Sequence, residues 1–175
     1  MEKMKDPWSV VVAVDDIPET GLHTEIDAPE AVRADLAKFA GLRELPHLSA
    51  VFDLTRRGAG AHVAGRVRAR LGQTCVVTLE PIESDLEEAI DLVFAPASGP
   101  AAQRPAKDLK AHEEPPEPLR DGVIDLGAIA TEFLLLGIDP YPRKAGADFA
   151  PVKADDGSAR PFAALEALKK RLGGS

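Results

Sequence analysis

The stretch AHVAGRVRARL, residues 61–71, alternates between two kinds of residue. Its odd positions hold Ala, Val, Gly, Val, Ala and Leu, whereas its even positions include Arg66, Arg68 and Arg70. A period of two is typical of a β-strand that buries one face and exposes the other. The stretch therefore predicts an antiparallel sheet with one face in contact with solvent.

Further strand signals lie on both sides of this stretch. Alternating or β-branched runs occur at 9–14, 50–56, 74–79, 84–94 and 122–124. Glycines and prolines separate several of these runs and supply the turns between them. The runs together predict an antiparallel, curved sheet of about five or six strands.

About three helices are predicted from apolar periodicity and from flanking residues. They cover residues 28–40, the segment from Asp125 to Gly137 and the segment from Ser158 to Leu172. Asp27 and Asp125 are candidate N-caps of the first two helices, because a carboxylate can accept hydrogen bonds from free backbone amides. Strands and helices together predict an α+β fold.

Residues 96–118 differ in composition from the rest of the chain. They contain six prolines and the acidic run EEPPE at 113–117. Such a segment buries too little apolar surface to offset the entropy lost on ordering, so we predict a flexible loop. The part that follows is too small to fold alone, and we therefore expect the loop to interrupt a single domain over residues 7–172.

The charge and the cysteine content narrow the class of protein. The net charge is −8, so any contact with nucleic acid would require a local basic face. A single cysteine excludes an internal disulfide, and neither a signal peptide nor a membrane-spanning run is recognisable. We expect a cytoplasmic protein that makes no membrane contact.

Two motifs, in this order, resemble those of a known family. The arginine-rich strand leads into CVVTLEP at 75–81, and IDLGAIATE at 124–132 opens the second predicted helix. They resemble the Cys-x-x-Cys-Leu-x-Pro motif and the Ile-Asp-Leu…Glu helix start of the bacterial YceD family, the large ribosomal RNA subunit accumulation proteins. The residues that match are Cys75, Leu79, Glu80, Pro81, Asp125, Leu126 and Glu132.

The resemblance implies a function in ribosome biogenesis. It suggests a non-enzymatic factor that supports accumulation of 23S ribosomal RNA, with an RNA precursor or an assembly intermediate as partner. No cofactor and no catalytic residue are expected. Thr78 replaces the second cysteine of the family pattern, and a single thiol cannot build a four-ligand zinc site, so no bound metal is expected either.

The arginines at 66, 68 and 70 are the candidate contact with RNA. Alternate residues of a strand lie about 6.5–7 Å apart, so three guanidinium groups in a row could follow a phosphate backbone. The predicted nucleic-acid-binding residues are Arg57, Arg66, Arg68, Arg70, Arg143 and Lys144. The acidic net charge favours an alternative, in which these arginines pair with Asp85, Glu87 and Asp91 on a neighbouring strand.

Two other functions remain open from the sequence. The chain could be a protein–protein adaptor that docks an RNA-processing enzyme or a ribosomal protein. It could also be an unrecognised enzyme with Cys75 as nucleophile, but no histidine lies near Cys75 in the sequence and no hydrolase motif is present. A buried structural role in a strand is the favoured interpretation of Cys75.

Overall fold

The computed structural model describes residues 7–96 and 115–148. By internal contacts the chain divides into two compact units, Met1–Ala145 and Gly146–Ser175. All helices and strands of the described residues lie in the first unit. The third predicted helix, from Ser158, lies outside the described residues.

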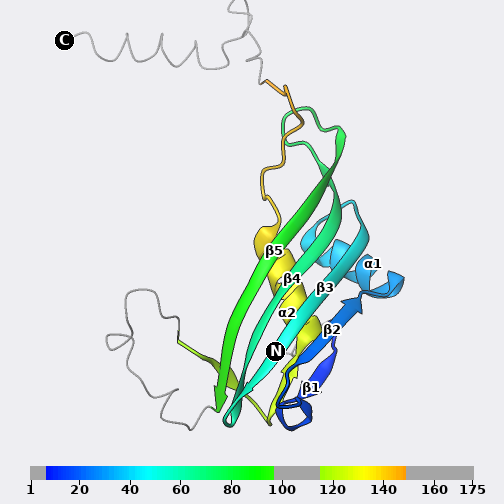
Figure 1. The fold of residues 1–175 in the computed structure, drawn as a ribbon. Coiled ribbons are helices and arrows are strands. Elements are labelled where there is room, and N and C mark those ends of the chain that lie inside the picture. The colour runs from blue at the N-terminus through cyan, green and yellow to red at the C-terminus, as the bar shows by residue number, and fades with distance from the viewer. Residues whose placement is uncertain (1–6, 97–114, 149–175) are drawn as a thin grey trace, which may run out of the picture. The chain divides into compact units, whose positions relative to one another are not determined.

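A five-stranded sheet forms the centre of the first unit, and the stretch 61–71 lies in its middle strand (Figure 1). The strands in spatial order are β2 (Leu22–Asp27), β3 (Glu44–Arg57), β4 (Gly60–Thr74), β5 (Pro81–Pro96) and β6 (Glu117–Leu119). The first three pairs are antiparallel, as the alternating pattern predicted. The pair β5–β6 is parallel, so the sheet is mixed at this edge.

A second, two-stranded sheet joins segments that are far apart in the sequence. It consists of β1 (Val11–Ala13) and β7 (Val123–Asp125), which are antiparallel. A short 3-10 helix, Val14–Asp16, follows β1, and the amide of Val14 donates to the carbonyl of Gly122 at 2.9 Å. This pairing ties the beginning of the described chain to the start of the second α-helix.

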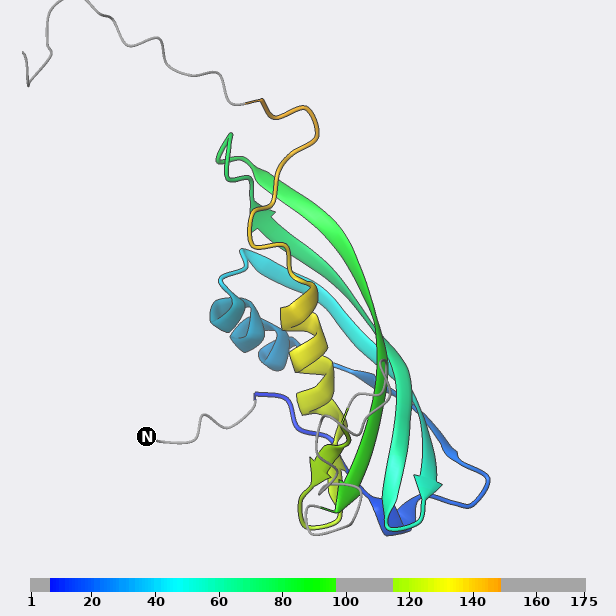
Figure 2. The same ribbon diagram turned by 90° about the vertical axis from the view of Figure 1, so that its left-hand side faces the viewer.

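Two α-helices, α1 (Glu30–Ala40) and α2 (Leu126–Gly137), lie on the same side of the sheet (Figure 2). Alternation along the strands directs Phe52 of β3 and Val67 of β4 towards them, and both side chains are fully buried. Leu36 of α1 and Leu134 of α2 complete this core. The other face of the sheet carries the exposed half of the alternating pattern, and no helix of the described ranges covers it.

Gly65 of β4 lies where the backbone of β3 leaves no room for a side chain. A Cβ atom at this position would collide with the carbonyl oxygen of Val51 and would lie 3.0 Å from Cδ1 of Phe52. The glycine therefore allows the Phe52 ring to fill the core beneath β4.

The start of α2 confirms the predicted cap at Asp125. Oδ1 of Asp125 accepts hydrogen bonds from the amides of Gly127 and Ala128, both at 3.1 Å. The same oxygen accepts from the amide of Val10 at 2.9 Å, and Oδ2 accepts from the hydroxyl of Ser9 at 2.6 Å. One carboxylate thus caps the helix and fixes the segment that precedes β1.

Two elements predicted from the sequence are wrong. The run 74–79 does not form a strand, because β4 ends at Thr74 and residues 76–78 form the turn that brings Pro81 opposite Thr74. Asp27 does not cap α1, because it is the last residue of β2, a strand that was not predicted, where it pairs with Ser49. Pro29 precedes α1 instead, without a side-chain capping bond.

The described residues contain two α-helices, which correspond to the first two of the three predicted, because the third lies outside them. One boundary of the predicted loop differs from the prediction. The predicted loop over 96–118 ends earlier, because Glu117 and Pro118 belong to β6 and lie beside Phe94 and Ala95 of β5. The pairing of β6 with β5 joins segments that are separated in the sequence, so no local sequence pattern predicts it.

Candidate functional site

The three arginines of β4 lie in one row on the exposed face of the sheet, opposite a row of carboxylates on β5. In the register of the two strands, Arg70 lies opposite Asp85 and Arg68 lies opposite Glu87. Nε of Arg70 lies 2.9 Å from Oδ1 of Asp85, and Nε of Arg68 lies 2.7 Å from Oε2 of Glu87. Nε of Arg66 reaches the other oxygen of Glu87 at 3.2 Å. We call these five residues the arginine ladder.

The arginines and the carboxylates of the ladder stabilise each other's charged forms. The hydrogen bond from Arg68 holds the pKa of the Glu87 carboxyl below its usual range, and the charges of both neighbouring arginines act in the same direction. The hydrogen bond to Asp85 raises the pKa of Arg70. The three arginine side chains are 52%, 58% and 55% exposed, so water and salt screen these pairs and each adds little to stability.

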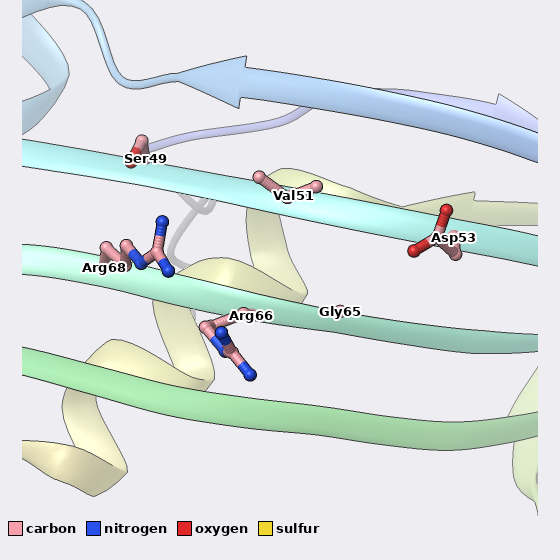
Figure 3. Close-up of a pocket in the computed structure, with 6 residues that line it drawn as sticks. All are labelled: Ser49, Val51, Asp53, Gly65, Arg66 and Arg68. Atoms are coloured by element: carbon pink, nitrogen blue, oxygen red, sulfur yellow. The ribbon is translucent and has the colours of Figure 1, made fainter.

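A shallow hollow lies beside the ladder on the same face (Figure 3). Its volume is about 360 Å³. Figure 3 shows Arg66 and Arg68 on β4, with Val51 and Asp53 along β3. The residues that line it are Ser49, Val51, Asp53, Gly65, Arg66 and Arg68. A second hollow, of about 490 Å³, also includes Arg68 and extends to Pro46, His47 and Arg70, so the two follow β4.

Histidine–carboxylate pairs continue the pattern of matched charges on the exposed face. Nε2 of His62 lies 2.6 Å from Oδ1 of Asp91, and Nδ1 of His23 lies 2.7 Å from Oδ1 of Asp53. The hydrogen bond and the charge of Asp53 raise the pKa of His23. The geometry of this face therefore matches the alternative prediction, in which the arginines pair with carboxylates of the neighbouring strand. Every ladder arginine already contacts a carboxylate.

A second constellation lies at the end of the β4–β5 hairpin. We define the hairpin tip as residues 75–80 together with the segment 139–144, which runs beside the hairpin end in both ribbon views (Figures 1 and 2). The amide of Val76 donates to the carbonyl of Pro142 at 2.9 Å, and the side chain of Gln73 donates to the carbonyl of Asp139 at 2.9 Å. These bonds join two parts of the sequence that lie more than sixty residues apart.

Cys75 is the buried centre of the hairpin tip. Its Sγ atom accepts hydrogen bonds from the amides of Lys144 at 3.3 Å and Thr78 at 3.4 Å. The bond from Lys144, followed by those from Thr78, lowers the pKa of the thiol to about 6. Cys75 is fully buried, as predicted, but it lies in the turn and not in a strand. Its role in this geometry is that of an acceptor for backbone amides.

Lys144 and Glu80 close the hairpin tip at the surface. Nζ of Lys144 donates to Oε2 of Glu80 at 3.0 Å, and this bond lowers the pKa of the Glu80 carboxyl. Lys144, one of the predicted RNA-binding residues, is therefore engaged in an ion pair. Arg143 next to it is exposed and lies at this end of β4.

The other predicted site residues are distributed over the molecule. Arg57 is exposed at the β3–β4 turn, opposite Gly60. Gly60 precedes Arg66 by six positions, which is roughly 20 Å along the strand. Leu126 is fully buried at the start of α2, and Glu132 is exposed on the same helix. The structure thus groups Arg66, Arg68 and Arg70 but separates them from Arg57.

Two exposed apolar residues lie at the hairpin tip: Leu79, which was predicted only as a match to the family motif, and Val76, which was not predicted as a site residue. Leu79 is 75% exposed and has a positive φ of 60°, and Val76 is 46% exposed. The sequence gives no local signal for the exposure of Val76, since the run 74–79 has the composition of a strand. Within residues 7–96 and 115–148, no group of three or more His, Cys, Asp or Glu side chains could hold a metal ion.

Comparison with known proteins gives one match. A sequence model of the YceD family, described as large ribosomal RNA subunit accumulation protein YceD, matches residues 63–169. The match covers more than half of the chain and includes both the arginine ladder and the hairpin tip. No curated protein and no solved structure matches the chain. None of the helices in the described parts of the chain is long and apolar enough to cross a membrane.

Proposed function

The chain belongs to the YceD family of large ribosomal RNA subunit accumulation proteins, and on this premise we propose that it acts as a non-enzymatic ribosome-assembly factor. Membership of the family implies a role in the accumulation of large-subunit ribosomal RNA. The proposal adds that the chain acts in the cytoplasm by binding a component of an assembly intermediate and that it catalyses no reaction.

The surroundings of Cys75 support the non-enzymatic part of the proposal. A nucleophilic cysteine must be accessible to its substrate, whatever its pKa. Cys75 is fully buried, and the partners of its sulfur are backbone amides of Thr78 and Lys144. These contacts suit a structural acceptor that holds two segments together.

The arginine ladder supports a protein, and not RNA, as the direct partner. A phosphate that approached Arg68 or Arg70 would have to displace a carboxylate at 2.7 or 2.9 Å. The chain as a whole carries a net charge of −8, which opposes the approach of RNA. The single observation that carries the proposal is that each ladder arginine already has a carboxylate partner. We therefore favour an adaptor that contacts a protein of the intermediate.

Direct contact with the ribosomal RNA precursor is the second candidate. The hollow beside Arg66 and Arg68 favours RNA contact, because both side chains are more than half exposed and could exchange partners (Figure 3). In this case Arg57, Arg66, Arg68, Arg70, Arg143 and Lys144 would contribute the phosphate contacts.

A complementation experiment tests the proposed function. We expect a strain without the chain to contain less mature large-subunit RNA relative to small-subunit RNA, and the intact chain to restore the ratio. If the intact chain leaves the ratio unchanged, the proposed function is wrong.

Ultraviolet crosslinking to RNA in the same strain separates the two candidates. The test variant carries Arg66→Gln, Arg68→Gln and Arg70→Gln, and the control carries Arg33→Gln, Lys38→Gln and Arg120→Gln, which remove the same charge elsewhere. The adaptor proposal predicts equal RNA crosslinking for the two variants. A loss of tenfold or more that is confined to the ladder variant would establish direct RNA contact instead.

A further inference from the structure

Leu79 combines two unfavourable properties at the hairpin tip. Its φ of 60° lies in the left-handed region, where the Cβ atom of a leucine is crowded and glycine or asparagine is more stable. Leu79 is 75% exposed, so little burial offsets the strain of its backbone in the isolated chain. The amide of Leu79 donates to the carbonyl of Cys75 at 3.0 Å, which fixes this conformation. Strained backbone positions of this kind cluster at functional sites.

Two further exposed apolar side chains belong to the same surface. Val76 is 46% exposed and its amide is bonded to Pro142, next to Tyr141, which is 71% exposed. The amide of Tyr141 donates to Oδ1 of Asp139 at 2.8 Å, and a proline stands on each side of the tyrosine. The ring is therefore presented on a stiff segment, which reduces the entropy lost when a partner covers it.

The charges around these apolar residues define the chemistry of the partner. Residues 74–85 and 139–145, counted with Arg70 because it pairs with Asp85, contain four carboxylates against three cations, a net charge of −1. The carboxylates are those of Glu80, Glu83, Asp85 and Asp139, and the cations are Arg70, Arg143 and Lys144. Lys144 is bonded to Glu80, and Asp85 is bonded to Arg70. The surroundings of the tip are therefore net acidic, which repels RNA phosphates and attracts lysine and arginine side chains.

We infer that the hairpin tip is the docking surface for a Lys- and Arg-rich protein whose apolar side chains cover Val76, Leu79 and Tyr141. Tyrosine and arginine are enriched in protein interfaces, and a few apolar anchors surrounded by charged groups supply most of the binding free energy. The inference deepens the proposed function, on which it rests, by naming the class of partner and the place of contact.

Site-specific photocrosslinking in cells tests this inference with the full chain. The test variant is Tyr141→p-benzoylphenylalanine, and the control places the same residue at Phe39, which is 55% exposed on α1. We expect a discrete adduct at the tip alone, sensitive to protease and resistant to ribonuclease, in which mass spectrometry identifies a protein with more Lys and Arg than Asp and Glu. An adduct that ribonuclease removes, an acidic partner, equal adducts at both positions or no adduct would overturn the inference.

A second pair of variants separates binding from folding. Leu79→Asn removes the apolar anchor but suits the left-handed backbone, so we expect an unchanged or higher Tm and at least a tenfold weaker adduct at Tyr141. Leu136→Asn removes a leucine that is 72% exposed on α2 and should leave the adduct unchanged. A lower Tm for Leu79→Asn, or an undiminished adduct, would contradict the inference. If these crosslinking results contradict the inference but the chain still restores large-subunit RNA in the same strain, the docking surface is wrong and the proposed function stands.

Discussion

Cys75 shows how one buried atom can join two distant segments. Its sulfur accepts from the amide of Thr78 within the turn and from the amide of Lys144, sixty-nine residues further along the chain. Amide donors stabilise the thiolate more than the thiol, which is why the pKa of Cys75 falls to about 6 despite its burial. The stability of the hairpin tip should therefore depend on the ionisation of this residue.

The first prediction concerns the pH dependence of that stability. The pKa of Cys75 is about 6 in the fold and near its ordinary value of 9.0 in the unfolded chain. Between these values the unfolded chain binds more protons, so the thiolate contribution is complete above pH 9, decreases as the pH falls and is lost below pH 6. Cys75→Ala should therefore flatten the rise in the free energy of unfolding over this range, as measured by urea titrations. Equal slopes for the two proteins would contradict this.

The second prediction concerns the carboxylate of Asp125. It accepts from two amides of α2, from the amide of Val10 and from the hydroxyl of Ser9. Asp125→Ala should lower the free energy of unfolding by about 2 kcal/mol, because three half-buried amide donors lose their acceptor. Asp125→Asn keeps one acceptor oxygen and should lose about half as much. Urea denaturation measures both values, and equal losses would show that the acceptor oxygens do not hold this junction.

At the scale of elements, the long strands of the sheet could be predicted because each has one buried and one exposed face. The alternation in β4 is visible in the sequence because the arginines occupy successive outward positions. β2 alternates in the same way, because Leu22, Thr24 and Ile26 are half-buried and the residues between them are exposed. The strand is short, however, and its last residue also resembles a helix cap. Residues 22–27 form a strand because they pair with β3, and a local sequence pattern does not reveal this pairing.

The candidate site was less predictable than the sheet. The arginine row followed from the period of two, and its acidic partners were recognised as an alternative, because both rows are strand patterns. Cys75, Leu79, Glu80, Arg143 and Lys144 were predicted site residues, but their grouping at one hairpin tip was not predicted. The reason is that the run 74–79 resembles a strand in composition. It becomes a turn because Val76 and Cys75 bond to the segment 139–144, and such long-range hydrogen bonds leave no pattern in the sequence.

The third prediction concerns the close approach of β3 and β4. A Cβ atom at Gly65 would collide with the carbonyl of Val51, so Gly65→Ala should force the two strands apart and lower the free energy of unfolding by about 1–3 kcal/mol. Ala64→Val, at the neighbouring half-exposed position of β4, is the matched control and should change it by less than about 0.5 kcal/mol. Thermal and urea unfolding measure both. A similar loss in the two variants would show that strand spacing is not the cause.

At the scale of the whole molecule, the core extends beyond the part that the family model matches. The match begins at residue 63, within β4. β2, β3 and α1 all precede it, and they contribute the fully buried side chains of Leu36, Leu48, Phe52 and Leu54. β4 pairs with β3 along most of its length. The matched segment therefore contains only part of one cooperative core.

The fourth prediction follows from this division of the core. A fully buried leucine or phenylalanine contributes about 1.5–3 kcal/mol, so the loss of these four side chains would remove roughly 6–12 kcal/mol. A domain has a total stability of only about 5–15 kcal/mol. A fragment of residues 63–169 should therefore not fold cooperatively, whereas a fragment of residues 1–148 should. Circular dichroism during urea titration distinguishes the two outcomes. A cooperative transition in the shorter fragment would show that β4 and β5 with α2 form an independent core, and that the strands and the helix before residue 63 are an addition to it.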